Sequence, residues 1–433
     1  MKIAIIGAGF TGLSAAWELI KSGHEVQVYE KDSMPGGLAA GFKDSEWQWE
    51  LEKHYHHIFS TDKAILQLLM EMGLSDLVFF QKTKTSLFYR NEKHQLDSPL
   101  SLLKFNPLSF INRCHVATVL ASLKLNKKGV NLEGKTAAQY LKKRMGEKAW
   151  NILWKPLFEG KFGQYANEVN MAWFWARIFA RSQKLGYFTG GFANLALQMT
   201  KKLQEKEVKF KFSSKVLKLK PSDGSWELSS KEEGKKKSNK EVFDKIIVTS
   251  THPVLEKIVD LPKELKKQHN RLQLLAAQTL VIALKKPFFE DQTYWLNINE
   301  NKWPFLAVVE QTNFIDKDKY GGNHLIYVAK YLKQSSKEYS LTKQQLLDKY
   351  SPFLKKLSSS YRKDLVKKTW LFKNDYAQPI SKVNHSAILP QMELSLPGLY
   401  WSSMQHIYPF DRGVNYAVDF GRKVAIILEE KNE

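Results

Sequence analysis

The chain has 433 residues, and 66 Lys and Arg against 44 Asp and Glu give it a formal net charge of +22. This length is enough for roughly two or three domains with buried cores. The single cysteine, Cys114, excludes an internal disulfide and fits a reducing compartment, and without a Cys cluster we expect no metal site. No apolar run reaches the roughly 18 residues that span a bilayer, and no secretory signal is recognisable, so we expect a cytoplasmic protein.

The excess positive charge is spread along the chain, with one dense run at residues 231–237. This run separates two predicted strands and indicates a solvated hairpin tip. Two interpretations of the total charge remain open: general solubility, or attraction to an anionic membrane or an anionic substrate. No nucleic-acid-binding module is recognisable, so nucleic acid is not an expected partner.

The N-terminal segment has the pattern of a dinucleotide cradle. An apolar strand at residues 3–6 leads into a glycine-rich turn and then into an amphipathic helix. Gly7 permits the tight turn, Gly9 lets a pyrophosphate approach, and Gly12 lets helix and strand pack closely. The helix N-terminus favours an anion. A second strand ends at Glu30, whose carboxylate can accept hydrogen bonds from ribose hydroxyls, which argues against the 2'-phosphate of NADP.

Two segments far apart in the chain indicate a flavin rather than a nicotinamide cofactor. The doublet Gly36-Gly37 follows the acid by six residues, residues 398–403 form a late apolar strand, and residues 416–425 form a final helix. These features resemble the flavoprotein superfamily of amine oxidases, protoporphyrinogen oxidases, phytoene desaturases and UDP-galactopyranose mutases. The resemblance implies noncovalently bound FAD, with the N-terminus of the last helix at the pyrimidine edge of the flavin.

The resemblance also implies which residues contact the cofactor. They lie in the glycine-rich turn, at the acid, in the doublet, at an adenine-reading valine, after the last strand and at the start of the last helix. The expected set is Gly7, Gly9, Phe10, Thr11, Gly12, Glu30, Lys31, Gly36, Gly37, Leu38, Val216, Ser403, Met404, Asn415, Tyr416, Ala417 and Val418. The family's usual Gly-Asp pair after the last strand is replaced by Ser403-Met404, which implies an altered FAD affinity or redox poise.

The implied fold is α/β: a Rossmann-like FAD-binding domain of the GR2 type, interleaved with a substrate domain made of an antiparallel sheet and a helical insert. We expect the FAD-binding domain at residues 1–80, 186–278 and 381–433, and the substrate domain at residues 81–185 and 279–380. Alternating apolar patterns predict a hairpin at residues 87–96 and further strands at residues 279–284, 294–298, 305–311 and 324–329.

Residues 102–113 and 171–181 of the helical insert are apolar or aromatic with interleaved bases. In protoporphyrinogen oxidases and desaturases the corresponding insert touches the bilayer and admits lipophilic substrates, which implies peripheral contact with the cytoplasmic membrane. The alternative is core packing, because Trp173, Arg177 and Arg181 recur at i, i+4 and can form one face. We prefer core packing.

The segment between the last strand and the last helix supplies most of the candidate catalytic residues. His406, Tyr408, Asp411 and Arg412 suit the binding of an acidic substrate or proton movement during hydride transfer. In the alternative interpretation, Asp411 and Arg412 only brace the loop as an ion pair.

A histidine-rich segment at residues 54–62 supplies the other candidate, His57. It resembles the segment that lies beside the isoalloxazine in UDP-galactopyranose mutases. Metal binding by these histidines is not expected, since no acidic or Cys partner has ligand spacing.

Departures from the family patterns narrow the expected chemistry. The lysine that many amine oxidases place near flavin N5 falls at Thr279, and their aromatic-cage tyrosine falls at Gly413, so amine oxidation is disfavoured. The mutases' arginine after the last strand is replaced by Gln405. We therefore expect an FAD-dependent oxidoreductase that moves a hydride from a carbon centre of a small or lipophilic substrate to flavin N5, with an unidentified electron acceptor. A flavin-dependent mutase acting on a nucleotide-sugar is the alternative, and a non-catalytic flavin scaffold is less favoured.

Overall fold

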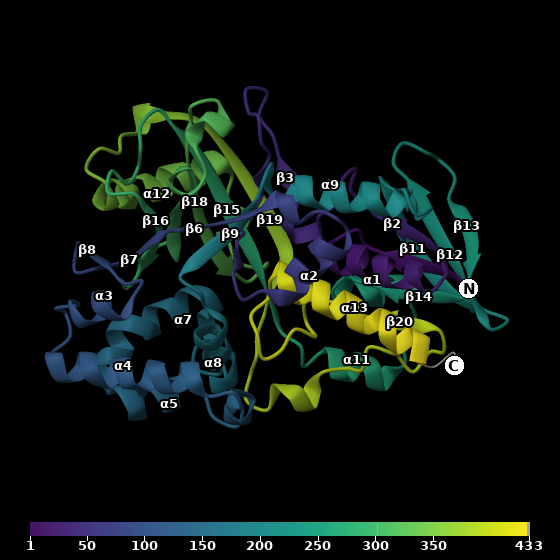
Figure 1. Ribbon diagram of the computed structural model, residues 1–433, viewed down its shortest axis with the longest axis horizontal. Coiled ribbons are helices and arrows are strands. Elements are labelled where there is room, and N and C mark those ends of the chain that lie inside the picture. The colour runs from purple at the N-terminus through teal and green to yellow at the C-terminus, as the bar shows by residue number, and fades with distance from the viewer. Residues whose placement is uncertain (301, 431–433) are drawn as a thin grey trace.

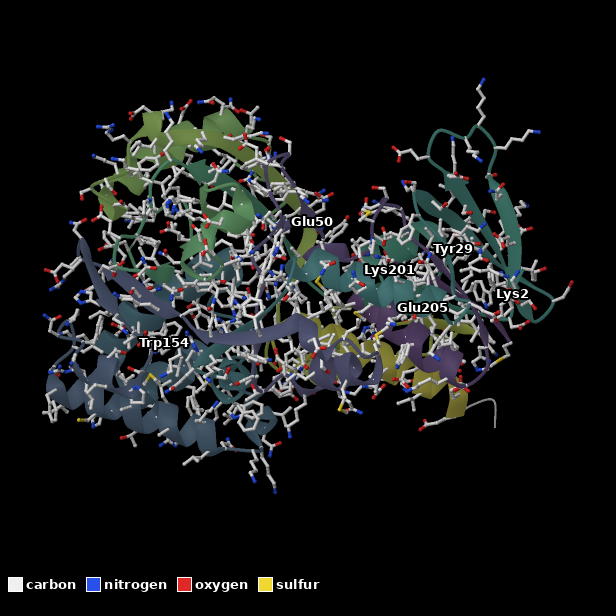
Figure 2. The ribbon with its side chains drawn as sticks, turned by 45° about the horizontal axis from the view of Figure 1, so that its top comes forward. Lys2, Tyr29, Glu50, Trp154, Lys201 and Glu205 are labelled. Atoms are coloured by element: carbon white, nitrogen blue, oxygen red, sulfur yellow. The ribbon has the colours of Figure 1, made fainter. Side chains whose placement is uncertain are left out.

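The computed structural model describes residues 1–300 and 302–430 (Figure 1). A parallel sheet with its helices lies at one end of the molecule, while a larger sheet and a layer of helices lie at the other. In Figure 2, Lys2 and Tyr29 mark the parallel sheet, and Trp154 marks the helical layer at the opposite end. The chain passes between the two ends several times, so each end is built from segments distant in sequence.

The parallel sheet forms the core of the first region. Its strands run in the order β10 (Lys209–Lys211), β2 (Glu25–Tyr29), β1 (Lys2–Ile6), β14 (Lys245–Val248) and β20 (Leu399–Trp401). Every neighbouring pair is parallel. Most of these strands are short and apolar because both faces of the sheet are buried: helices cover one face, and antiparallel strands within residues 214–243 cover much of the other.

Helix α1 (Phe10–Lys21) packs closely against helix α13 (Val414–Glu430). Ser14 Oγ donates a hydrogen bond to Val418 O at 3.0 Å. A Cβ at Gly421 would lie 2.2 Å from Thr11 O, so only glycine permits this approach. The first and last helices of the chain are thereby fixed side by side over the glycine-rich turn.

Further elements complete the region around the parallel sheet. They are α2 (Lys63–Glu71), α9 (Gly191–Gln204), α10 (His252–Ile258), α11 (Lys263–His269) and the antiparallel strands β11 (Ser214–Ser222), β12 (Ser225–Glu232) and β13 (Asn239–Phe243). The turn between β12 and β13 contains exposed Lys235 and Lys236, which confirms the predicted solvated hairpin tip.

The larger sheet, here called the substrate sheet, has the order β19 (Val366–Pro379), β15 (Leu274–Leu284), β18 (His324–Leu332), β17 (Ala307–Glu310), β16 (Thr293–Ile298), β7 (Lys84–Tyr89) and β8 (Glu92–Gln95). Its pairs are antiparallel except for β16 with β7, which is parallel. The predicted hairpin and strands are confirmed. Strand β19 was not predicted, because its mixed polar sequence on a half-exposed edge lacks a clear apolar alternation.

The two faces of the substrate sheet differ in character. One face is apolar and is covered by α12 (Lys343–Leu357). On the other face, the register aligns Thr279 with Ala329 and Val281 with Tyr327. Because side chains alternate along a strand, Thr279, Tyr327 and Tyr331 point to this second face. It therefore presents hydroxyl groups toward the rest of the molecule.

The helical layer lies beside the substrate sheet (Figure 1). It contains α3 (Pro99–Leu103), α4 (Phe110–Leu125), α5 (Ala137–Met145), α6 (Glu147–Ala149), the π-helical turn Trp150–Trp154, α7 (Lys155–Phe162) and α8 (Met171–Ala180). Trp173, Phe174 and Trp175 are buried in one cluster with Phe158 and Phe162. The preferred interpretation of the aromatic stretch as core is confirmed for these side chains.

Short strands join the regions at the crossings. Strand β9 (Lys184–Phe188) pairs with β6 (Val78–Lys82) and with β5 (Ile58–Phe59), and β3 (Gly41–Phe42) pairs with β4 (Leu51–Glu52). These crossings lie close to the expected limits at residues 80 and 185, although the division into domains remains a prediction. Among the described residues, no helix is both long and apolar enough to cross a bilayer.

Candidate cofactor site and active site

The glycine-rich turn after β1 has the geometry that an anion cradle requires. Gly7 has φ +110° and donates its N–H to Tyr29 O at 2.8 Å. A Cβ at Gly12 would lie 2.0 Å from Gly7 O, so the turn and helix α1 can be this close only with glycine. No side chain caps the N-terminus of α1. Its first backbone N–H groups therefore suit the pyrophosphate of a dinucleotide.

Glu30 lies directly beside this turn at the end of β2. Its Oε2 accepts a hydrogen bond from Ala8 N at 2.8 Å, and its Oε1 accepts one from Asp32 N at 3.0 Å. Burial raises the pKa of Glu30, and the two N–H donors partly oppose that rise. Ser214 N donates to Glu30 O at 2.8 Å, which brings the start of β11 and buried Val216 to the same place. The carboxylate oxygens have further lone pairs for ribose hydroxyls, so this corner fits the adenosine half of FAD.

The glycine doublet faces the glycine-rich turn. Gly36 has φ +119° and donates its N–H to Ala8 O at 2.9 Å. A Cβ at Gly37 would lie 3.2 Å from the Cα of Gly9. Two backbone segments without side chains thus lie against each other beside the N-terminus of α1. Half-buried Leu38 follows in the same loop, and Lys31 is exposed and pairs with Asp32.

The end of β20 lies at the same edge of the parallel sheet as the glycine-rich turn, and α13 packs against α1 beside that turn. Ser402 N donates to Val248 O at 3.0 Å, and the following Ser403 is buried while Met404 is half-buried. Asn415 Oδ1 accepts a hydrogen bond from Ile65 N at 3.2 Å and so caps α2. Tyr416 stacks on Phe410, with ring centroids 4.6 Å apart. Ala417 and Val418 continue the helix, and Val418 is fully buried against α1.

The histidine-rich turn at residues 54–57 lies between β4 and β5. His54 Nδ1 lies 2.8 Å from Thr279 Oγ1, and His56 Nδ1 donates to His54 O at 2.6 Å. Burial lowers the pKa of His54 and of His57 to about 3, and that of His56 to about 4. All three imidazoles are therefore neutral at pH 7. Each of the three side chains is also partly exposed.

Aromatic rings form the wall next to the histidine-rich turn. The rings of Tyr55 and Trp295 are edge to face with centroids 4.7 Å apart, and the rings of His57 and Trp295 are 5.9 Å apart. His57 Nδ1 is buried without a hydrogen-bond partner among the described residues. A neutral imidazole nitrogen in this position can accept a proton.

Charged side chains from the helical layer meet the loop before α13. Asp411 Oδ2 lies 2.7 Å from Lys161 Nζ and 2.5 Å from Arg177 Nη1. Arg412 donates to Tyr331 OH and to Ala377 O. Asp411 therefore forms its side-chain ion pairs with Lys161 and Arg177 of the helical layer. The alternative prediction, an ion pair between Asp411 and Arg412, named a different partner.

These charges shift one another's protonation. Burial would raise the pKa of Asp411, but Lys161, Arg177 and Arg412 hold it well below its usual range. Burial lowers the pKa of Lys161, and Asp411 partly opposes this effect. Burial would raise the pKa of Tyr331, but the positive charges of Arg412 and Lys161 lower it. The cluster is therefore a charged region with a surplus of cations.

Comparison with known proteins identifies the family of this chain. Residues 10–427 match the family of flavin containing amine oxidoreductases. The chain belongs to this family. The 15-cis-phytoene desaturase of Synechococcus elongatus is 33% identical over 109 residues, which are 23% of this chain and 23% of the desaturase. The chain thus spans less than a quarter of the length of that relative.

Solved structures agree with this flavoprotein in fold. A protoporphyrinogen oxidase candidate from Exiguobacterium sp. 255-15 has a TM-score of 0.76 at 15% identity and covers 99% of both chains. Reduced UDP-galactopyranose mutase has a TM-score of 0.78 at 15% identity, covering 99% of this chain and 95% of the other. The expected superfamily, the α/β fold with its second sheet and the FAD cofactor are thereby confirmed.

The flavoprotein brings only part of the expected catalytic set together. Arg177 pairs with Asp411 and also lowers the pKa of His57, after burial and Arg181, so these side chains are neighbours. Arg412 likewise contributes to the low pKa of His54, after burial and His56. His57, Asp411 and Arg412 thus border one region, and the roles of these residues remain predictions.

His406 and Tyr408 are engaged elsewhere. The ring of His406 packs 4.5 Å from Trp401, its Nδ1 accepts from Ser403 N at 3.2 Å, and burial lowers its pKa to about 4. Tyr408 OH donates to Glu133 Oε2 at 2.8 Å and accepts from Asn170 Nδ2 at 3.0 Å. Both residues hold the loop between β20 and α13 in place.

The sequence interpretation missed Lys161, Tyr331 and the pairing of His54 with Thr279. Only the i, i+4 spacing of Arg177 and Arg181 signalled that bases from α8 share a face. Across residues 1–300 and 302–430 no group of His, Cys, Asp or Glu side chains is arranged to hold a metal ion.

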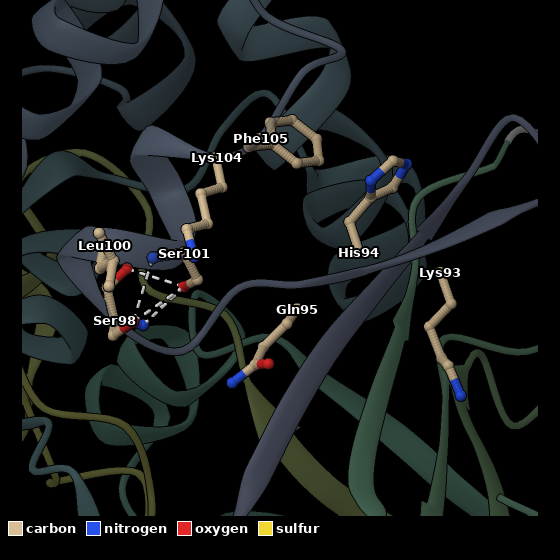
Figure 3. Close-up of a pocket in the computed structure, with 8 residues that line it drawn as sticks. All are labelled: Lys93, His94, Gln95, Ser98, Leu100, Ser101, Lys104 and Phe105. Carbon is tan, nitrogen blue, oxygen red and sulfur yellow. Dashed lines mark hydrogen bonds between the residues drawn. The ribbon is translucent and has the colours of Figure 1, made fainter. Parts of the chain in front are cut away.

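Cavities also occur away from the glycine-rich turn. One of about 350 Å³ lies between β8 and α3 and is lined by His94, Lys104 and Phe105 among others (Figure 3). Figure 3 shows Ser98 and Ser101 joined by hydrogen bonds at its edge. Another cavity, of about 400 Å³, borders Tyr331 at the edge of the substrate sheet. The first is a surface pocket of the helical layer and is distinct from the cofactor cradle.

Proposed function

We propose that the protein is an FAD-dependent oxidoreductase that removes a hydride from a carbon centre of a small or lipophilic substrate. When bound, FAD supplies the hydride acceptor and later passes the electrons to a second, unidentified acceptor. The observation that carries this proposal is the neutral His57, whose unpaired Nδ1 lies in an aromatic wall beside the substrate sheet. Loss of a hydride from carbon leaves an acidic proton, and His57 accepts it.

We infer the cofactor-binding residues from the geometry of the glycine-rich turn and from the family resemblance. Backbone groups of Gly7, Gly9, Phe10, Thr11, Gly12, Gly36, Gly37 and Leu38 border the diphosphate, and Glu30, Lys31 and Val216 border the adenosine half. Ser403, Met404, Asn415, Tyr416, Ala417 and Val418 approach with backbone atoms, because the side chains of Asn415 and Val418 are used in packing. These contacts are noncovalent, and the single Cys114 lies in α4, away from the glycine-rich turn.

A primary amine does not fit this site. Thr279 stands where many amine oxidases have a lysine, and its hydroxyl is engaged by His54. The neighbouring charges are Lys161, Arg177 and Arg412 against Asp411, so a cationic amine meets repulsion. A neutral or acidic substrate is favoured on electrostatic grounds.

A mutase that acts on a nucleotide-sugar is the second candidate, because the same cations suit a diphosphate. Against it, Gln405 replaces the mutases' arginine and points into a different contact. Its Oε1 accepts from His252 N at 2.9 Å, and its Nε2 lies 2.7 Å from His252 Nδ1. His252 holds both polar atoms of this amide, and an amide lacks the positive charge that arginine offers a diphosphate, so the oxidoreductase is preferred.

The oxidoreductase proposal is tested with oxidised holoenzyme under anaerobic conditions. Candidate compounds are added one at a time, and bleaching of the flavin absorbance reports its two-electron reduction. Deuterium at the oxidised carbon should slow the bleaching, and His57→Gln should slow it by about 10²-fold or more, as for loss of a general base. A compound set that bleaches only the amine-oxidase control, and never this protein, contradicts the proposal.

We also propose peripheral contact with the cytoplasmic membrane through α3 and the start of α4. Leu100, Phe110 and Ile111 are 62%, 65% and 67% exposed, and Lys104 and Arg113 flank them. Apolar side chains rimmed by bases suit an anionic bilayer surface. Sedimentation with phosphatidylglycerol vesicles tests this contact. The double substitution Phe110→Ser and Ile111→Ser should abolish it, whereas equal binding by that variant contradicts it.

A further inference from the structure

We propose that Lys161, Arg177, Arg181 and Arg412 form a subsite that binds an acidic group of the substrate, a carboxylate or a phosphate. This inference rests on the proposed function, because it names the chemical class of that enzyme's substrate. Lys161 comes from α7, Arg177 and Arg181 come from α8 and its C-terminal end, and Arg412 precedes α13. Segments that are distant in the chain thus direct positive charge to one place.

The positive charge of this subsite is not balanced. Asp411 pairs with Lys161 and Arg177, while the Arg412 guanidinium donates hydrogen bonds to the Tyr331 hydroxyl and the Ala377 carbonyl. The Arg181 guanidinium has no hydrogen bond or ion pair within residues 1–300 and 302–430; burial and Arg177 lower its pKa, and Asp97 opposes them.

Arg181 follows Arg177 by four residues, at the C-terminal end of α8. The residue is exposed to solvent, yet surrounding protein desolvates its guanidinium enough to lower its pKa, and Arg177 lowers it further. The Arg177 side chain is likewise 43% exposed while it pairs with largely buried Asp411. Both guanidiniums can therefore be reached from solvent, and charge–charge interactions are stronger where protein displaces water around such groups.

The subsite is rigid and lies next to the proposed proton acceptor. The Arg177 guanidinium stacks over the ring of Trp173 at 5.1 Å, and Lys161 Nζ lies 5.4 Å from the same ring. Trp173 is buried in the helical core, so it holds both bases in position. Arg181 and Arg177 in turn contribute to the low pKa of His57, after burial. An acid bound here would lie close to His57.

Positively charged side chains that protein desolvates are costly in free energy unless an anion compensates their charge. A bidentate guanidinium–carboxylate or guanidinium–phosphate contact supplies that compensation with directional hydrogen bonds. Carboxylate and phosphate share this chemistry, and the experiment has one arm for each. Hexanoate represents a carboxylate, inorganic diphosphate represents a phosphate, and hexylammonium is the matched cation.

The test is isothermal titration calorimetry on oxidised wild-type holoenzyme, with ionic strength held constant by sodium chloride so that general screening does not change. We expect hexanoate or diphosphate to bind and hexylammonium not to bind. Binding of hexanoate alone assigns a carboxylate, and binding of diphosphate alone assigns a phosphate. Failure of both acids to bind overturns the subsite, as does equal binding of hexylammonium.

Substitutions locate the binding. Arg181→Gln should weaken binding of the acid about tenfold or more, because a charged hydrogen bond is lost, and Arg181→Lys should retain most of it. Arg181 has no partner within the described residues, so its replacement leaves no ion pair broken. The matched control is Arg144→Gln, which removes the same charge from an exposed position on α5 of the same helical layer. Equal weakening by Arg144→Gln, or none by Arg181→Gln, overturns the assignment.

The two proposals fail in different ways. Acid binding is measured on oxidised flavin without turnover, whereas the oxidoreductase proposal is measured by bleaching. If a compound bleaches the flavin but no acid binding depends on Arg181, only the subsite is overturned. Acid binding without bleaching by any compound overturns the oxidoreductase and supports the subsite.

Discussion

His54 Nδ1 and Thr279 Oγ1 are 2.8 Å apart, and this hydrogen bond joins the histidine-rich turn to the substrate sheet. The two residues are 225 positions apart in the chain. Thr279 is buried on β15, so the bond fixes the imidazole against a rigid strand. Next to it, His56 Nδ1 donates to His54 O, which orders the turn that also carries His57. Thr279 thus serves to position a neutral histidine.

The first prediction concerns this bond. Thr279→Val keeps the shape of the side chain but removes the hydroxyl, which leaves the His54 nitrogen without its partner. The free energy of unfolding should fall by about 1–2 kcal/mol, measured by urea denaturation of the holoenzyme. Thr279→Ser retains the hydroxyl and should stay within about 0.5 kcal/mol of the wild type. Equal losses in both variants would show that packing, not the hydrogen bond, matters at Thr279.

The second prediction tests whether the glycine-rich turn, where Gly9 lies against Gly37, binds FAD. A Cβ at Gly9 would meet the Cα of Gly37 at 3.8 Å, an ordinary contact, so a side chain at this position does not by itself prevent folding. Gly9→Glu places a carboxylate where the diphosphate approaches, and like charges repel. Purified Gly9→Glu protein should lack the flavin absorbance while its far-UV circular dichroism stays that of a folded chain. Normal flavin content in Gly9→Glu would remove the glycine-rich turn from the cofactor site.

The third prediction concerns stability at low pH. Burial lowers the pKa of His57 to about 3, whereas an unfolded histidine titrates near about 6.5. Between those values the unfolded chain binds more protons, so the free energy of unfolding falls as the pH is lowered through this window. Each such histidine contributes up to about 1.4 kcal/mol per pH unit. His54, His56 and His406 add to the effect in the same direction.

Comparing the wild type with His57→Gln gives the contribution of His57 alone to this pH dependence. All other titrating groups, including carboxylates with lowered pKa values, are the same in both proteins. Denaturation curves at pH 5.0, 5.5, 6.0 and 7.0 should show a shallower decline for His57→Gln than for the wild type. Parallel declines would mean that His57 is protonated as readily in the folded protein as in the unfolded chain.

The fourth prediction separates stability from anion binding. Asp411→Asn removes the carboxylate between Lys161 and Arg177, and the free energy of unfolding should fall by about 2–3 kcal/mol. The value lies below that of a fully buried pair because 19% of the Asp411 side chain is exposed. The same change raises the net positive charge, so affinity for hexanoate or diphosphate should increase.

The control for that variant is Asp419→Asn, since Asp419 pairs with Lys423 on the surface of α13. An exposed i, i+4 pair contributes about 0.3–0.5 kcal/mol, so this change should barely affect stability or anion binding. Weaker anion binding in Asp411→Asn would show that Asp411 itself contacts the ligand or that the cations lose their arrangement without it.

Local spacing made the cofactor half of the molecule predictable. Gly7, Gly12 and Glu30 lie within one strand–helix–strand unit, and a backbone turn of that kind admits few residue types. The Gly36-Gly37 doublet follows in the next loop for the same reason. Their positions in the structure follow directly from the order of residues.

The active-site half depended on tertiary contacts that no local pattern contains. Lys161 and Asp411 are 250 residues apart, and their pairing arises only when α7 packs beside the loop before α13. His406 lies in the polar loop after the last strand, yet its ring packs against Trp401. Strand β19 was missed because a half-exposed edge strand tolerates charged residues at both alternating positions.

The most direct test of an electron-transferring enzyme starts from reduced protein. The holoenzyme is photoreduced without oxygen, a quinone, oxygen or UDP-galactopyranose is then added in separate experiments, and the flavin spectrum is recorded. The account predicts rapid reoxidation by quinone or oxygen and no conversion of the sugar. A flavin that stays reduced while UDP-galactopyranose is isomerised would contradict the account and assign the protein to the mutases.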